Sequence, residues 1–208
     1  NQDYQLIEPR KRWPIGVFDS TIIPSDQHIE QGRAMCLLGD AGWGSEIKNC
    51  FSNNSPVSDD FLDAALYLIE KKWNPDPFPD IIVDFIGSHY GTVANFGERL
   101  SERLNIDYWG SDDPDDLLIQ RGKKNFKMSH MNNSHHKVLN GLDKFKICTG
   151  GPDRFLYNIN DEIANNDLID FHKQRHNILL IDDYVDTRWT FTILGAMLSK
   201  LGHTVYPF

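Results

Sequence analysis

Cysteine is scarce in this sequence. The 208 residues contain three, Cys36, Cys50 and Cys148, which stand far apart along the chain. Three scattered cysteines provide neither a disulfide framework nor the paired spacing of a zinc site. We therefore expect reduced thiols and a cytoplasmic location.

Long apolar runs and an excess of positive charge are also missing. No run approaches the roughly 18 apolar residues that cross a membrane, and the opening residues lack the apolar segment of a signal peptide. The formal net charge of -9 disfavours nucleic acid as the dominant partner. We interpret the basic clusters at residues 9–14 and 120–127 as solvated segments. Because the chain starts without Met, we expect a piece of a longer protein, such as its C-terminal part.

Strand patterns alternate with helix patterns through much of the chain. Ser58 is a favourable N-cap and is followed by acidic residues, as at the start of a helix. The predicted helices cover residues 58–73, 93–105 and 160–174, with another after residue 190. The predicted strands cover residues 80–87, 106–109, 177–181 and 203–208. This alternation predicts an α/β fold with a mainly parallel sheet flanked by helices.

The beginning of the chain is irregular by comparison. We predict that residues 1–57 form an N-terminal extension that packs on a core domain of residues 58–208. Glycines around Trp43 predict a tight turn before a short helix. Residues 110–145 are polar, rich in Asn and His and weakly periodic, so we interpret them as a long mobile loop. We expect its His-rich run at residues 130–136 to be solvated rather than to bind a metal.

Three carboxylates follow the predicted strand at residues 177–181. They belong to Asp182, Asp183 and Asp186. Ligands of open parallel sheets bind beyond the carboxyl ends of strands, and the first N–H groups of a following helix attract phosphates. A sugar phosphate suits this pairing, because its hydroxyls donate to carboxylates while its phosphate lies on the helix end. Asp and Thr are also common N-caps, so a structural role stays open, although adjacent acids repel each other.

The stretch "ILLIDDYVDTRWT" resembles the ribose-phosphate signature of type I phosphoribosyltransferases. The resemblance implies that Asp182 and Asp183 bind the ribose hydroxyls of phosphoribosyl pyrophosphate. It also implies that Mg²⁺ arrives with this ligand and meets the two acids only indirectly. The residues that it assigns to the 5′-phosphate loop are Asp186, Thr187, Arg188, Trp189 and Thr190. Asp186 matches the general base of purine-specific members, so the implied catalytic residues are Asp182, Asp183 and Asp186.

Several positions depart from the family pattern. Tyr184 stands where an aliphatic residue is usual, and Arg188 replaces the glycine that lets the backbone close on the phosphate. The expected pyrophosphate loop consists of Gly87, Ser88, His89, Tyr90 and Gly91. It has no Lys or Arg, although a leaving pyrophosphate requires cations. His89 is either a partly charged substitute or part of a drifted loop. In active members of this family, a flexible segment closes over the substrate. The resemblance implies that Lys123, Lys124 and Lys127 lie in this segment and contact the pyrophosphate.

The elements "DTRWTFT", "GDAGWG", "IEPRKRWP" and "VYPF" together resemble phosphoribosyltransferase-like domains appended to bacterial RecQ-type DNA helicases and related to the ComF group. One alternative is an enzyme that transfers phosphoribosyl to a nucleobase and releases pyrophosphate. Another is a non-catalytic nucleotide-binding module that regulates a helicase or DNA-processing partner, in cis or in trans. A domain for protein contacts alone is the weakest alternative, and assembly as a homo-oligomer stays open. Trp189 either stacks on a base or packs against the neighbouring helix.

Overall fold

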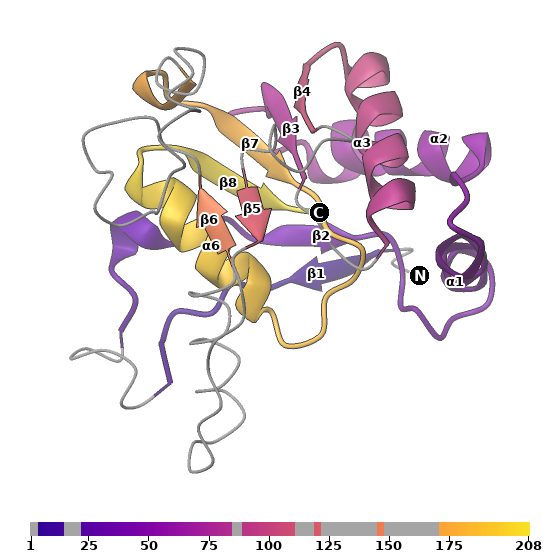
Figure 1. Cartoon of the computed structure of the whole chain (residues 1–208), viewed down its shortest axis with the longest axis horizontal. Coiled ribbons are helices and arrows are strands. Elements are labelled where there is room, and N and C mark those ends of the chain that lie inside the picture. Colours follow the sequence, from indigo (N-terminus) through magenta and orange to yellow (C-terminus); the bar gives the residue numbers. More distant parts are fainter. Residues whose placement is uncertain (1–3, 15–21, 85–88, 111–118, 122–144, 148–170) are drawn as a thin grey trace.

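A four-stranded parallel sheet forms the centre of the structure. The computed structural model describes residues 4–14, 22–84, 89–110, 119–121, 145–147 and 171–208. The strand order is β4-β3-β7-β8, and each neighbouring pair is parallel. These strands are β3 (Ile81–Val83), β4 (Asp107–Trp109), β7 (Asn177–Leu180) and β8 (Thr204–Pro207). The predicted α/β fold with a mainly parallel sheet flanked by helices is therefore confirmed (Figure 1).

Helices cover both faces of this sheet. They are α1 (Trp43–Asn53), α2 (Asp59–Tyr67), the π-helical η2 (Leu68–Trp73), α3 (Tyr90–Leu104) and α6 (Trp189–Lys200). Ile178 and Leu180 of β7 pack in the core cluster with α6, whereas Leu179 and Ile181 pack with α2 and α3. All four side chains are at most 1% exposed. Burial on both faces explains why this strand reads as a continuous apolar run rather than an alternating one.

The helix α2 begins at the predicted N-cap. The Ser58 hydroxyl oxygen accepts a hydrogen bond from the Phe61 N–H at 3.1 Å, which satisfies one of the unpaired donors of the first turn. The helix continues into η2 and ends at Asn74, whose φ of 44° is left-handed. The helix α3 begins at Tyr90, which is earlier than predicted. The predicted helices at both places are confirmed.

The N-terminal part of the chain lies along the β8 edge of the sheet. Its elements are β1 (Gln5–Ile7), the 3-10 helix η1 (Ser25–Gln27), which packs on α6, and β2 (Gly32–Ala34), which is antiparallel to β1. The Glu30 N–H donates to the Val205 carbonyl at 2.9 Å. A Cβ on Gly32 would lie 2.1 Å from the Pro207 carbonyl oxygen, so this approach of β2 to β8 requires glycine. The predicted domain boundary after residue 57 stays a prediction.

The prediction of a mobile loop over residues 110–145 is wrong where strand β5 (Ile119–Arg121) lies. This strand pairs antiparallel with β6 (Phe145–Ile147). Strands of three residues show too little alternation to be recognised, and the partner lies outside any local window. The His-rich run and Lys123, Lys124 and Lys127 lie outside the described residues.

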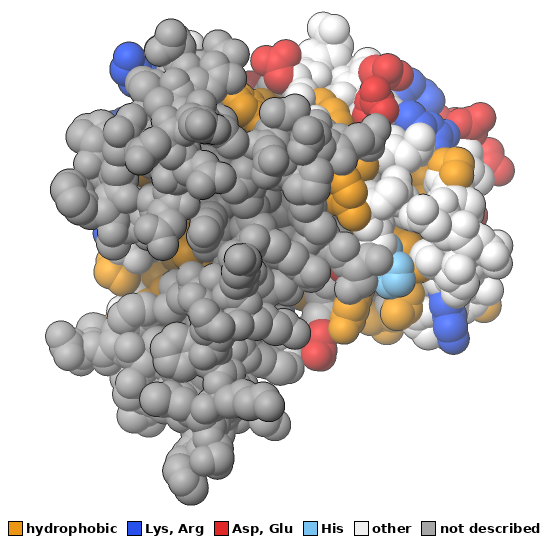
Figure 2. Space-filling model, viewed as in Figure 1, with side chains coloured by type: hydrophobic (Ala, Val, Ile, Leu, Met, Phe, Trp, Pro, Cys, Tyr) orange, Lys and Arg blue, Asp and Glu red, His pale blue; other side chains and the backbone are white. Residues whose placement is uncertain are grey.

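Basic side chains over α2 and α3 are paired with acids. Arg99 lies 2.6 Å from Asp59, and Arg103 lies 2.6 Å from Asp63, each pair joining the two helices. In Figure 2 blue and red side chains accordingly lie side by side over these helices, and the described part of this face carries no continuous basic stripe. Among the helices that the structure describes, none has the length and apolar character needed to span a bilayer.

Candidate functional site

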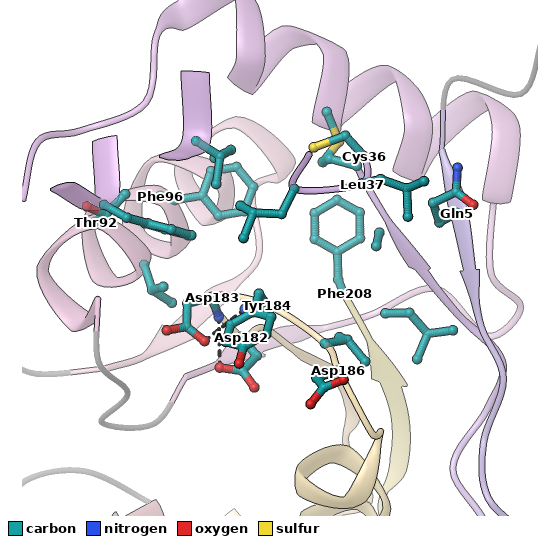
Figure 3. A pocket seen from close by; sticks show the side chains of 18 of the residues that line it. Gln5, Cys36, Leu37, Thr92, Phe96, Asp182, Asp183, Tyr184, Asp186 and Phe208 are labelled. Carbon is teal, nitrogen blue, oxygen red and sulfur yellow. Dashed lines mark hydrogen bonds between the residues drawn. The ribbon is translucent and has the colours of Figure 1, made fainter. Parts of the chain in front are cut away.

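The paired acids lie at the carboxyl end of β7. The sheet hydrogen bonds hold the backbone as far as Asp182, whose N–H donates to the Phe208 carbonyl at 3.2 Å. One carboxylate oxygen of Asp182 then accepts from the Asp183 N–H at 2.7 Å, and one of Asp183 accepts from the Tyr184 N–H at 2.8 Å (Figure 3). Each acid therefore turns the backbone that follows it. Asp182 and Asp183 are half-buried, while Asp186 is exposed.

The turn ends in a left-handed residue directly before α6. Arg188 has φ of 68° and ψ of 2°, a conformation that glycine adopts with least strain. Its carbonyl accepts from the Thr192 N–H at 3.0 Å and from the Thr192 hydroxyl at 2.8 Å, so the helix begins here. The Arg188 side chain makes no capping hydrogen bond to α6. Arg188 therefore adopts a backbone conformation that favours glycine.

Two arginines meet beside this turn. Arg10 donates from Nε to the Thr187 carbonyl at 2.7 Å, and Arg188 donates to the Glu8 carbonyl at 3.1 Å. Burial, and then the neighbouring charge of Arg188, lowers the pKa of Arg10. Within residues 9–14, which we interpreted as a solvated segment, Arg10 is half-buried and Trp13 is buried. The contact with Thr187 joins residues at opposite ends of the chain, so no local pattern announces it.

Trp189 packs beneath the turn. Its side chain is 5% exposed and stacks on Trp13, with ring centroids 6.4 Å apart and planes inclined by 13°. The Arg10 guanidinium lies 4.1 Å from the centre of its ring. The other buried members of this small core cluster are Ile23, Ile193 and Ala196. Of the two alternatives for Trp189, the structure shows packing.

The acidic turn forms one side of a cavity of about 360 Å³. The residues of the turn that line it are Asp182, Asp183, Tyr184, Val185, Asp186 and Arg188. The remaining walls come from β1, the segment after β2, α1 and the first turns of α3, with Phe208 in the middle (Figure 3). Three residues of the expected phosphate loop are not part of this lining: Thr187 of the turn, and Trp189 and Thr190 of the first turn of α6. The cavity thus joins carboxylates on one side to mostly apolar side chains on the other.

The predicted pyrophosphate loop is described only in part, because Gly87 and Ser88 lie outside the described residues. The His89 ring stacks on Phe51 of α1, with centroids 4.3 Å apart and planes inclined by 8°. Tyr90 begins α3, and a Cβ on Gly91 would lie 2.5 Å from a side-chain atom of Asn54. The described part of this loop therefore packs against the end of α1.

Sequence reasoning missed one acid, Asp84. It follows β3, which ends at Val83 rather than at the predicted residue 87, and its side chain is fully buried. Tyr108 donates a hydrogen bond to Oδ2, whereas Oδ1 has no partner among the described groups. Burial raises the pKa of Asp84 to about 6, against the opposing effect of the Tyr108 hydroxyl. An acid at the end of a strand could have been recognised in the sequence. Because apolar residues flank Asp84 on both sides, the pattern instead predicted that it lies inside the strand.

Comparisons with known proteins give one distant likeness. The sequence matches no protein-family model, and no curated protein is similar enough to count as a relative. Among solved structures, adenine phosphoribosyltransferase from Leishmania tarentolae is similar, with a TM-score of 0.40 and 18% sequence identity. The likeness covers 76% of this chain and 57% of that enzyme, so the chain spans little more than half of the enzyme's length. A likeness this distant carries no conclusion about ligand or activity.

Proposed function

We propose that the cavity binds a ribose 5-phosphate group, presented by phosphoribosyl pyrophosphate or by a nucleotide. The observation that carries the proposal is the half-buried pair Asp182 and Asp183, which lines the cavity directly before the turn into α6. Ionised carboxylates only accept hydrogen bonds, and a vicinal diol offers two donors at matching spacing. The start of α6 offers unpaired N–H groups to a phosphate.

The arginines support a phosphate at this place. Arg188 lines the cavity, and its charge lies near enough to Arg10 to disfavour the charged form of Arg10. A dianionic phosphate between the turn and these cations would relieve this repulsion. The departure from glycine at position 188 therefore adds a cation to the proposed site without changing the backbone conformation.

Magnesium fits the proposal as part of the ligand. Among the described residues, no group of three or more His, Cys, Asp or Glu side chains lies close enough to hold a metal ion. Mg²⁺ bound to the oxygens of phosphoribosyl pyrophosphate would neutralise part of the pyrophosphate charge. Asp182 and Asp183 would then orient the sugar and reach the ion through the ligand.

Phosphoribosyl transfer to a nucleobase is the second candidate function. Asp186 lines the cavity and is exposed, which supports a role in taking a proton from a base while the bond to pyrophosphate breaks. The expected pyrophosphate loop argues against transfer. Its one basic side chain, His89, is stacked on Phe51. Binding without transfer, as in a regulatory module, is therefore the function that we favour. The attachment of this domain to a helicase stays a prediction.

Calorimetry with phosphoribosyl pyrophosphate and Mg²⁺ tests the proposal. We expect the paired substitution Asp182→Asn and Asp183→Asn to weaken binding at least tenfold, because hydrogen bonds to charged groups contribute about 1.5–3 kcal/mol each. Asp59→Asn with Asp60→Asn is the matched control, because these adjacent acids lie outside the cavity at the start of α2. Absence of heat with the unmodified protein, or equal affinities for both double variants, would contradict the proposal. Pyrophosphate release with a nucleobase present would establish transfer.

A further inference from the structure

We infer that the group joined to the sugar in this cavity is an apolar ring rather than a polar nucleobase. The inference rests on the proposed function and names the class of ligand that the same site takes. It is carried by the side chains that face the acidic turn. They come from β1, the segment after β2, α1, α2 and α3, and among the described residues they are mostly hydrocarbon.

Strong hydrogen-bonding side chains are few on these walls. Gln5, Cys36 and Thr92 carry the polar side-chain atoms. The Thr92 hydroxyl already donates to the Ser55 carbonyl at 2.9 Å. Burial, and then the charge of Asp40, raises the pKa of the Cys36 thiol, so it stays a neutral, weak donor. Among the described residues of the walls that face the acids, Gln5 is therefore the strongest side-chain donor, while the Thr92 hydroxyl keeps only its acceptor capacity.

A nucleobase does not match such walls. Each polar edge atom that loses water without finding a partner lowers the affinity by roughly tenfold or more. A ring without polar edge atoms loses nothing and gains from contact with aromatic walls such as Phe51, Phe96 and Phe208. The chemistry of the walls therefore selects an apolar ring.

The rim of the cavity extends this apolar surface into solvent. Leu6, Leu37 and Tyr184 line the cavity and are 45%, 53% and 55% exposed. Figure 3 shows Leu37 and Tyr184 on facing walls of the cavity. Large exposed hydrophobic side chains that gather at one opening mark a binding site. A volume of about 360 Å³ lies at the lower end of the range of roughly 300–1,000 Å³ for small-molecule sites, which suits a sugar with one ring.

Three probes measured by calorimetry test this inference. They are ribose 5-phosphate, adenosine 5′-monophosphate, and the analogue in which a phenyl group replaces adenine. We expect the phenyl compound to bind at least tenfold more tightly than adenosine monophosphate. The variant Leu37→Gln should weaken binding of the phenyl compound several-fold more than it weakens binding of ribose 5-phosphate. Ile22→Gln is the matched control, because Ile22 is 55% exposed and lies outside the cavity lining.

The outcomes separate this inference from the proposed function. If ribose 5-phosphate binds and adenosine monophosphate binds more tightly than the phenyl compound, the inference is overturned and the proposed function stands. If ribose 5-phosphate and its derivatives do not bind, the proposed function fails and the inference fails with it. Equal effects of Leu37→Gln and Ile22→Gln on the phenyl compound also overturn the inference.

Discussion

Asp84 is a buried acid whose folded environment favours the protonated form more than the unfolded chain does. The ordinary Asp pKa of 3.8 rises to about 6 through burial, so the folded state binds the proton more tightly than the unfolded state. Its contribution to the free energy of unfolding is therefore largest at low pH and is lost as the pH rises from 3.8 to 6. By linkage the loss is on the order of 2–3 kcal/mol.

We predict that Asp84→Asn abolishes this loss, because the amide does not ionise. Urea denaturation between pH 4 and pH 8 should show that the variant loses less stability on raising the pH than the unmodified protein. Asp107→Asn is the control, since Asp107 is exposed on the neighbouring strand β4. Identical pH profiles for Asp84→Asn and the unmodified protein would contradict the expected role.

His203 has the opposite pH dependence at the other end of the sheet. Its Nδ1 accepts from the His176 N–H at 3.1 Å, so this nitrogen carries no proton, and its Nε2 lies 2.9 Å from Nδ1 of His172. Burial, and then the neighbouring histidines, lowers the pKa of His203 from 6.5 to about 3. Its contribution to stability is therefore complete above pH 6.5 and is lost as the pH falls toward 3.

We predict that His203→Asn makes the acid side of the stability profile shallower. The Asn side-chain oxygen keeps an acceptor for the His176 N–H but does not titrate. The slope of unfolding free energy between pH 6.5 and pH 3 should fall by up to about 1.4 kcal/mol per pH unit. His28→Gln is the control, because it retains a donor for the Ile23 carbonyl and His28 belongs to another part of the fold. An unchanged slope in His203→Asn would show that His203 is not the titrating group.

At the scale of elements, Gly195 sets how closely the N-terminal segment approaches α6. A Cβ at this position would lie 1.6 Å from Cγ2 of Ile29, a β-branched side chain that is 6% exposed. We predict that Gly195→Ala lowers the free energy of unfolding by about 1–3 kcal/mol through overpacking, although alanine favours a helix by about 1 kcal/mol. In an Ile29→Ala background the same substitution should stabilise the protein. Equal effects in both backgrounds, measured by denaturant unfolding, would exclude this contact as the cause.

The sequence predicts most elements of the sheet, because their signals are local. The apolar run before Asp182, the N-cap Ser58 and the alternation of strands with helices each lie within one short window. Strand ends are less certain, as β3 shows by ending before Asp84. The strands β5 and β6 were not predicted. The formation of a three-residue strand depends on pairing with its partner strand more than on its own sequence pattern.

At the scale of the whole molecule, the acidic half of the candidate site could be predicted and the other half could not. Asp182 and Asp183 stand beside each other in the sequence, directly after a strand. Arg10 and Leu37 reach the same turn from the other end of the chain, and only the docking of β2 beside β8 brings them there. A single sequence contains no record of such docking. The helicase context and the catalytic competence stay predictions for the same reason.

We predict that residues 58–208 alone do not fold cooperatively. Removing residues 1–57 would take away Ile7 and Ile29 from one core cluster and Cys50 from the other, together with most of the apolar wall of the cavity. Thermal unfolding followed by circular dichroism should show a broad transition without a defined midpoint. A sharp transition would instead support the predicted boundary after residue 57 as the edge of an independent domain.

The contact of β2 with β8 also dictates an order of events during synthesis. Glu30 and Gly32 find their places only after Val205 and Pro207 have been made. Closing so long a stretch of chain is entropically unfavourable, and high contact order slows folding. Until then, the apolar side chains of β1 and β2 that pack against the central sheet have no partner surface. The candidate cavity, which Phe208 and the segment after β2 both line, therefore forms only after residues 205–208 have been made, and a nascent chain held before residue 205 lacks it.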